Sequence, residues 1–326
     1  MNFLSKRFLW ADIVRIVAIF LVVQIHAVSA YPDWLYSFIL KLNATSIPLF
    51  ILLSGSLLLG KRENYQRFFR KRIIKVLIPW VIWTFIYLIY FLYFKHDDQY
   101  TNEIISRPGE LSNTFFSLFM SGLWFLPLIF SLYIITPALR ILVVKASDID
   151  IIYIFVFWFA VFSFLPYFLS NSLFPAWSPS LALTTFQYSG YFLIGYFLVK
   201  KNLKLNKYFR FIFFLILMII FILPIPLKGY LDPAVGISSI IFFILLISFS
   251  NQIEGKIRKK MKYFISVVSG ASLGIYLVHQ LVIYELTKYK EVLIDYRIIS
   301  GIIVFFLSCA IILIFQKIPI VKHIVP

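Results

Sequence analysis

The chain has 326 residues, of which 61% are hydrophobic and only 14% are charged, and its mean hydropathy is +0.91. A soluble domain carries about 25% charged residues, so the composition excludes a soluble protein and indicates a polytopic membrane protein. The formal net charge of +17 raises the question of a nucleic-acid partner. The only cysteine, Cys309, excludes disulfides within the chain and a metal–thiolate cluster.

Ten apolar segments, bounded by polar or Pro-rich breaks, predict an all-α bundle of about ten transmembrane spans. No soluble domain is expected, so residues 1–326 are predicted to form a single integral membrane domain. The second and eighth segments are short enough to be tilted or partly buried. The predicted spans are 11–30, 46–60, 73–94, 122–144, 151–169, 181–199, 209–227, 234–250, 266–287 and 298–316.

The distribution of basic residues predicts that both termini are cytoplasmic. With that orientation, most of the 31 Lys and Arg residues fall in inner segments, above all in 61–75, 200–210 and 256–262. This excess on one side fixes the orientation and requires an even number of spans. It also explains the net positive charge as an attraction to the anionic lipids of the inner leaflet, and not to nucleic acid. The outer segments hold Lys41, Lys95, Arg107, Lys228, Lys288, Lys290 and Arg297.

The first span carries Asp12, Arg15 and His26, although a charge in the lipid core costs about 2.5–3.5 kcal/mol. Arg15 and His26 are eleven residues apart, which returns to within about 20° of the same helix face. Asp12 is placed to pair with Arg15 at i,i+3. Arg15 lies near the cytoplasmic end and His26 about 16 Å further along, near the outer end. One flank of this span is therefore predicted to face a polar passage.

The ninth span has a polar stripe of its own, at Ser269, Ser272, Tyr276 and His279. Small and polar residues at this spacing are typical of helix–helix hydrogen bonding in membranes, and they also suit the lining of a site. The residue that orients His26 must come from another helix or loop, because Asp12 is about 21 Å away. The candidates for that residue are Asp33, Ser54, Glu285 and His279.

Short motifs in chain order resemble a known family. They are Arg15 with His26; Ile47-Pro-Leu-Phe50 with Ser54-Gly55; Arg70-Lys-Arg72 before Pro79; Leu123-Trp-Phe-Leu126 with Tyr133 and Pro137; Phe192-Leu-Ile-Gly-Tyr196; and Ser272-Leu-Gly-Ile-Tyr276-Leu-Val-His279. Together they are similar to the acyltransferase-3 family of integral membrane acyltransferases, which decorate bacterial surface glycans. The chain departs from the family pattern at Gly122, Ser56 and Trp80, which weakens any assignment of the acceptor.

The resemblance implies transfer of an acyl group, usually acetyl, from cytoplasmic acyl-CoA to a hydroxyl outside. The acceptor is a cell-surface polysaccharide or a lipid-linked glycan precursor at a bacterial plasma membrane, and no metal is expected. His26 is then the general base, or it carries the acyl group covalently. The resemblance also implies a catalytic role for Arg15 beside His26. It further implies Arg15, Arg70 and Arg72 for the CoA phosphates, and Ser54, Trp124, Tyr276 and His279 for the lining of the substrate site.

Other readings of these residues remain open. Arg70 and Arg72 lie in a basic run that the membrane orientation already explains, and residues i and i+2 point about 200° apart on a helix. A transporter or flippase for the glycan would also explain the spans and the polar stripe. Against it, Asp12 and Glu285 are the only acids in the predicted spans, and no Pro- or Gly-broken helix pair is evident at mid-membrane.

Overall fold

The structure is a computed structural model that describes residues 7–27, 33–94, 123–168, 181–202, 205–223, 227, 229–287, 297–319 and 321–325. These residues form helices and turns, with no β-strand among them, which confirms the all-α prediction. The longer helices are α1 (Leu9–Ala27), α2 (Asp33–Ala44), α3 (Ser46–Leu58), α4 (Tyr65–Arg72), α5 (Ile78–Phe94), α8 (Phe125–Lys145), α9 (Asp148–Phe159), α11 (Leu181–Lys201), α12 (Lys207–Ile222), α13 (Pro233–Ile253), α14 (Lys259–Gly270), α15 (Ser272–Thr287) and α17 (Arg297–Phe315).

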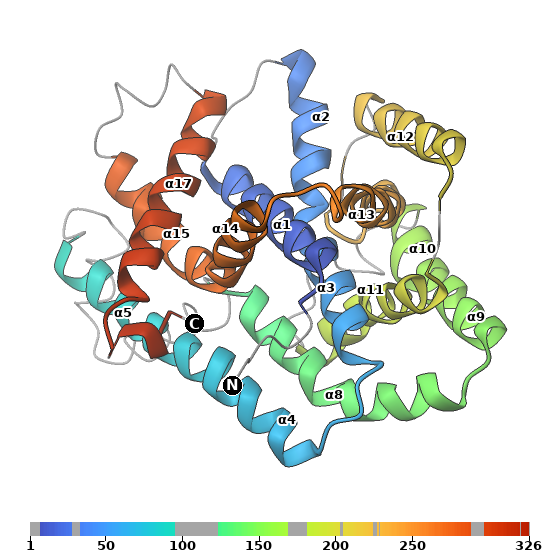
Figure 1. The fold of residues 1–326 in the computed structure, drawn as a ribbon, viewed down its shortest axis with the longest axis horizontal. Helices are drawn as coiled ribbons and strands as arrows, with labels where there is room; N and C mark the ends of the chain where they lie inside the picture. The colour runs from blue at the N-terminus through green and yellow to red at the C-terminus, as the bar shows by residue number, and fades with distance from the viewer. Residues whose placement is uncertain are drawn as a thin grey trace.

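Helix α1 lies at the centre of the bundle (Figure 1). It packs against α3, α13, α14, α15 and α17. Small or branched apolar side chains cover its circumference, and Val14, Ala18, Ile19 and Val23 are completely buried. A helix that is apolar all round is stable only when other helices enclose it, as here. Along most of its length, the side chains of α1 therefore face neighbouring helices and not lipid.

Helices α3 and α11 approach each other through two glycines. A Cβ atom on Gly55 would lie 1.8 Å from the carbonyl oxygen of Phe192, and one on Gly195 would lie 2.1 Å from that of Leu52. Such backbone contact is what small residues permit between membrane helices. The Ser54-Gly55 motif therefore serves packing through its glycine, which leaves Ser54 on a neighbouring face of α3.

We expect Gly195→Ala to lower the free energy of unfolding by about 1–3 kcal/mol, because the added methyl group meets backbone that cannot rotate away. The matched control is Gly255→Ala, since no atom lies within 4 Å of a Cβ at Gly255. Equilibrium unfolding of both variants in detergent micelles measures the difference. Equal stability of the two variants would contradict the close α3–α11 contact.

Two π-helical segments lie just before prolines. The first, η1 (Ile73–Leu77), precedes Pro79 in α5, and the second, η3 (Ala160–Phe164), precedes Pro166 in α10 (Leu165–Phe168). Proline has no N–H group and its ring clashes with the carbonyl group four residues earlier. A wider π turn relieves that clash and keeps the helix continuous. Tyr65–Phe91 thus forms one stretch of 27 residues that carries Arg72 near its start.

Six helical stretches of the described chain are long and apolar enough to cross a membrane, and a seventh if a bent pair forms one span. Each of the ten predicted segments overlaps a helix, but α11, α12 and the apolar part of α17, Ile299–Phe315, fall outside these six. The six stretches are Leu9–Ala27, Ser37–Leu58, Tyr65–Phe91, Phe125–Lys145, Asp148–Phe168 and Pro233–Ile253.

Two details differ from the sequence prediction. The predicted span 266–287 corresponds to a bent pair, in which Lys259–Gly270 and Ser272–Leu286 are inclined by 59°. The chain therefore does contain a broken helix pair, which removes one of the arguments against a transporter. Lys41 is not in an outer loop but in α2, where it is 2% exposed and its ammonium donates to the carbonyl groups of Ile220 and Leu223. A lysine can satisfy the free carbonyl groups at the end of a helix, here α12.

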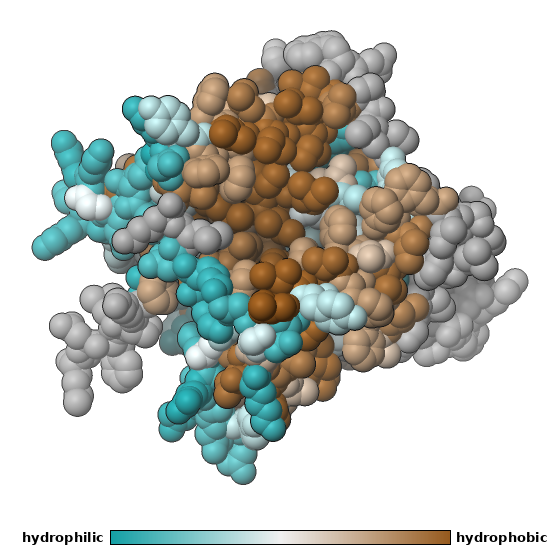
Figure 2. All heavy atoms as spheres, turned by 90° about the vertical axis from the view of Figure 1, so that its right-hand side faces the viewer, coloured by the Kyte–Doolittle hydropathy of each residue, from teal (hydrophilic) through white to brown (hydrophobic). Residues whose placement is uncertain are grey.

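The surface of the molecule is divided between apolar and hydrophilic regions. Figure 2 shows a broad apolar region, with hydrophilic side chains gathered to one side of it. On α9 and α12 large apolar side chains are exposed, among them Tyr153, Phe157, Phe211 and Ile219. An apolar surface of this extent is stable against lipid and not against water. The fold is therefore that of a multi-pass membrane protein.

Candidate active site

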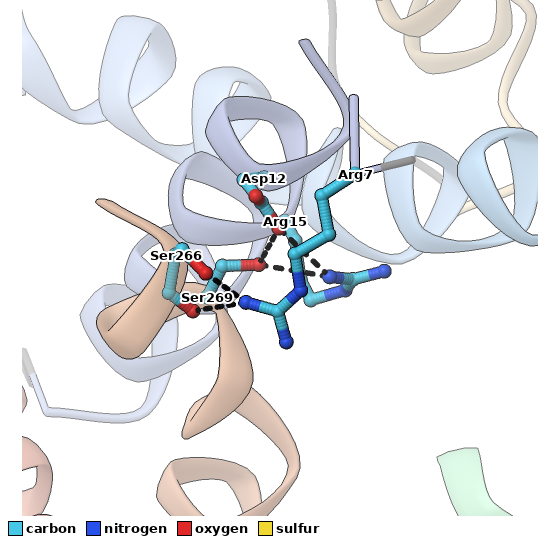
Figure 3. Close-up of polar contacts among 5 residues, drawn as sticks. All are labelled: Arg7, Asp12, Arg15, Ser266 and Ser269. Carbon is cyan, nitrogen blue, oxygen red and sulfur yellow. Dashed lines mark hydrogen bonds and ion pairs between the residues drawn. The ribbon is translucent and has the colours of Figure 1, made fainter. Parts of the chain in front are cut away.

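Arg15 is held at one end of α1 by a three-residue network (Figure 3). Its Nη1 donates to Oγ of Ser269 at 2.8 Å and lies 3.4 Å from Oδ1 of Asp12. The Ser269 hydroxyl in turn donates to the same Asp12 oxygen at 2.6 Å. Asp12 and Ser269 are buried, whereas the side chain of Arg15 is 29% exposed. The network fixes the guanidinium and leaves part of it accessible to a ligand.

A second guanidinium lies beside the first (Figure 3). Arg7 donates through Nη1 to the carbonyl oxygen of Ser266 at 3.1 Å and also to its hydroxyl. Helix α14 therefore holds both arginines, while Asp12 is the one carboxylate in the network shown. This end of α1 carries a net positive charge. The sequence analysis did not single out Arg7, because it precedes the predicted span 11–30.

Tyr133 of α8 lies among three of the residues that the sequence assigned to the site. Its hydroxyl is within hydrogen-bonding reach of the Ser54 side chain, and it lies in the electrostatic field of both Arg15 and Arg72. The guanidinium carbon of Arg72 is 5.5 Å from the centre of the Tyr133 ring. Arg15, Arg72 and Ser54, which come from three separate helices, thus converge around one tyrosine.

Arg70 does not join this group. It lies two residues before Arg72 on α4, so the two side chains leave the helix in nearly opposite directions. Arg72 lies over the ring of Phe68, with 4.3 Å between the guanidinium carbon and the ring centre, whereas Arg70 is exposed. As long as α4 is a regular helix, Arg70 and Arg72 therefore cannot both reach a compact ligand, as their spacing predicts.

His26 and His279 lie together near the other end of α1. Their ring centres are 5.2 Å apart and the ring planes are inclined by 61°. Nδ1 of His26 is 2.7 Å from the carbonyl oxygen of Val22, and Nδ1 of His279 is 2.6 Å from that of Tyr276. A carbonyl oxygen can only accept, so each Nδ1 carries the proton, and each neutral ring has its lone pair on Nε2.

The two imidazoles differ in exposure. His26 is exposed, whereas His279 is 2% exposed, and Nε2 of His279 has no hydrogen-bond partner among the described residues. Of the four candidates for orienting His26, His279 is the one in ring contact with it. Ser54 lies by Tyr133, Glu285 accepts a 2.6 Å hydrogen bond from the hydroxyl of Tyr90, and the Asp33 side chain is outside the described residues.

The remaining predicted lining residues lie in different surroundings. Tyr276 is buried, and its ring centre is 5.6 Å from that of His279 and 5.7 Å from that of Phe125. Trp124 instead contacts the rings of Tyr188 and Tyr230, at 6.4 and 5.5 Å. Tyr276 therefore belongs to the imidazole pair, and Trp124 belongs to an aromatic group between α8 and α11.

The flank of α1 that carries Arg15 and His26 is not polar along its whole length. Ile19 and Val22, which stand between Arg15 and His26 on the same flank, are buried and apolar. The flank is polar only at its ends, where Arg15 meets Ser269 of α14 and His26 meets His279 of α15. The predicted stripe of the ninth span does face α1 at both of these points. The described residues contain no group of three His, Cys, Asp or Glu side chains placed to hold a metal ion.

These features define a multi-pass helical membrane protein. Guanidinium groups lie at one end of the contact between α1 and the pair α14–α15, and imidazole groups lie at the other end. The family model described as an acyltransferase domain matches residues 8–316. The chain belongs to the acyltransferase-3 family, and it is a membrane acyltransferase. No curated protein and no solved structure matches it.

We expect Asp12→Asn to lower the free energy of unfolding by about 1–3 kcal/mol, because Asn still accepts from Ser269 but leaves Arg15 without its counter-charge. The matched control is Asp148→Asn, which removes a carboxylate paired with Lys200 and Lys201 at the surface. That change is expected to cost clearly less, because water screens an ion pair at the surface. Unfolding curves in detergent compare the two variants, and an equal loss would mean that the Asp12 network adds no stability.

Proposed function

We propose that the protein transfers an acyl group, most simply acetyl, from cytoplasmic acyl-CoA to a hydroxyl on the opposite side of the membrane. The acceptor is a cell-surface polysaccharide or a lipid-linked glycan precursor, and the membrane is the bacterial plasma membrane. The observation that carries this proposal is the attachment of both ends of one α1 flank to the bent pair α14–α15, guanidinium at one end and imidazole at the other.

The guanidinium groups near the Arg15 end of α1 suit the phosphates of the donor. A guanidinium presents N–H groups in a planar fork that matches phosphate oxygens. Arg7, Arg15 and Arg72 supply three such groups, with Asp12 fixing one of them. The family resemblance adds Arg70, whose exposed side chain reaches the donor only if the donor extends around α4.

The imidazole pair, His26 and His279, suits the chemical step. Nε2 of His26 takes the proton of the acceptor hydroxyl as its oxygen attacks the thioester carbonyl carbon. The carbon–sulfur bond then breaks, the ester oxygen keeps the acyl group, and the CoA thiolate accepts a proton. His279 and Tyr276 line the acceptor side of this site with Trp124 beyond them, and Ser54 lines the donor side. Attack by Nε2 of His26 on the thioester itself is the covalent variant of this mechanism.

His26→Ala is expected to reduce acyl transfer by about 10²-fold or more, because a positioned general base contributes a factor of that order. His26→Gln is the stricter variant, since it retains side-chain volume and a donor for the Val22 carbonyl group but supplies no base. The measurement is acyl transfer from radiolabelled acetyl-CoA in membrane vesicles. Size-exclusion profiles of the purified variants check the fold, and wild-type rates in both variants would reject this role of His26.

The same assay separates an enzyme from a glycan transporter. An acyltransferase consumes acyl-CoA only when the acceptor is present, and it leaves acylated glycan detectable by mass spectrometry or NMR. A flippase moves unmodified glycan and consumes no acyl-CoA. A labelled acyl group retained on His26 after acid quenching of a reaction without acceptor would select the covalent variant.

We further propose that α11, α12, α17 and the bent pair α14–α15 also cross the membrane, which together with the six stretches gives ten spans and two cytoplasmic termini. The excess of basic residues in alternate segments supports this orientation.

Cysteine labelling in intact cells tests α11 and α12, on a Cys309→Ala background. If α11 crosses, Lys207→Cys at the start of α12 is protected from a membrane-impermeant maleimide, because it lies in the cytoplasm. If α12 then crosses, Lys228→Cys is labelled. Labelling of Lys207→Cys would place α11 outside the set of membrane spans.

A further inference from the structure

Arg140 of α8 is a buried arginine that is only partly satisfied. Its side chain is 8% exposed, and its Nε donates to the carbonyl oxygen of Leu58, the last residue of α3, at 3.0 Å. Its Nη1 and Nη2 are both buried and have no hydrogen-bond partner among the described residues. Buried polar groups in folded proteins are almost always paired, so two free guanidinium nitrogens call for a ligand.

A second guanidinium lies against the same aromatic ring. The guanidinium carbons of Arg140 and Arg72 are 4.6 and 4.3 Å from the centre of the Phe68 ring. The ring attracts each cation through its quadrupole, but it carries no net charge. The two arginines therefore repel each other beside a completely buried phenylalanine, and the ring does not offset that repulsion.

The segment between α3 and α4 adds more positive charge. Partial burial lowers the pKa of the Lys61 ammonium, and the nearby guanidiniums of Arg72 and Arg140 lower it further. Glu63 is the acid nearby, but its carboxylate is hydrogen-bonded to Lys71, which holds the pKa of Glu63 below its usual range. Glu63 also attracts Arg140 and Arg72, but a single carboxylate among four cations leaves the cluster with a net positive charge.

An unpaired buried cation destabilises a protein, because it loses its hydration without gaining a counter-ion. Such a group is stable when a ligand supplies the missing charge and acceptors. Phosphate does both, since its oxygens match the paired N–H groups of a guanidinium. The neighbouring side chains of Lys61 and Arg72 are at least partly exposed, so they give a ligand access to Arg140 from the α3–α4 side.

We propose that Arg140, together with Arg72 and Lys61, binds a phosphate group of the acyl donor, as an anchoring point separate from Arg7 and Arg15. The assignment to the donor rests on the proposed function. Arg72 links the two points, because it also lies beside Tyr133, which interacts with Arg15. A donor such as CoA, with a phosphate monoester and a diphosphate, has two phosphate-bearing parts to occupy them.

The test measures ligand binding apart from activity. Thermal unfolding of the purified protein in detergent is followed with adenosine 3′,5′-bisphosphate, or with adenosine as the uncharged probe. We expect the bisphosphate to stabilise the wild type and the control variant Lys145→Met, which removes a charge from the exposed end of the same helix. In Arg140→Met the affinity is expected to fall at least about tenfold. Arg140→Lys, which keeps the charge but not the fork, is expected to lie between these two.

The stability of Arg140→Met without ligand distinguishes a purely structural role of Arg140 from a ligand-binding role. If Arg140 serves only to hold the end of α3, Arg140→Met unfolds at a lower temperature than the wild type and still binds the bisphosphate normally, which overturns the proposal. If the arginine is kept for a ligand, Arg140→Met without ligand is at least as stable as the wild type, because an unpaired buried charge has been removed.

Two further measurements identify the source of the phosphate and test the proposed function independently of the phosphate site. Stabilisation by phosphatidylglycerol that depends on Arg140, with none by the bisphosphate, would assign the site to a lipid headgroup and reject the donor. In the activity assay, acetyl-CoA and its 3′-dephospho form are compared: loss of the wild-type preference in Arg140→Lys supports a contact with the 3′-phosphate. Binding of the bisphosphate through Arg140 without any acyl transfer by the wild type would reject the proposed function and leave the phosphate site standing.

Discussion

The enclosure of α1 by neighbouring helices is the constraint on which the site depends. A helix in that position has no access to lipid headgroups along most of its length, so its polar side chains must find partners on neighbouring helices. Asp12 and Arg15 find Ser269 at one end, and His26 finds His279 at the other. The same bent pair of helices supplies both partners, which ties the two ends of the site to one structural unit.

Helix α3 connects this centre to the outer part of the bundle. The reciprocal glycine contacts with α11 bring the two backbones together, and that approach determines where Ser54 and Leu58 lie. Ser54 then meets Tyr133, and the carbonyl group of Leu58 meets Arg140, both on α8. A packing contact that carries no chemistry thus positions the partners of Tyr133 and Arg140.

The parts of the site that the sequence predicts are those that helical geometry fixes locally. The pairing of Asp12 with Arg15, the shared flank of Arg15 and His26, and the divergence of Arg70 from Arg72 follow from 3.6 residues per turn. The partner of His26 and the contact of Lys41 with the end of α12 depend on tertiary packing, which periodicity does not contain. Arg140 lies within the predicted span 122–144, where an arginine is itself a sign of function, but its contacts with Leu58 and Phe68 also depend on tertiary packing.

The break in the helix pair α14–α15 falls between its two attachments to α1. Ser269 precedes the break and His279 follows it, and nothing lies within 4 Å of a Cβ at Gly270. The two halves are therefore held separately against α1, one at the guanidinium end and one at the imidazole end, while Ala271 at the junction is completely buried. Any change in the 59° bend would alter the separation of the serine and the imidazole, so the spacing between the two ends of the site depends on one angle.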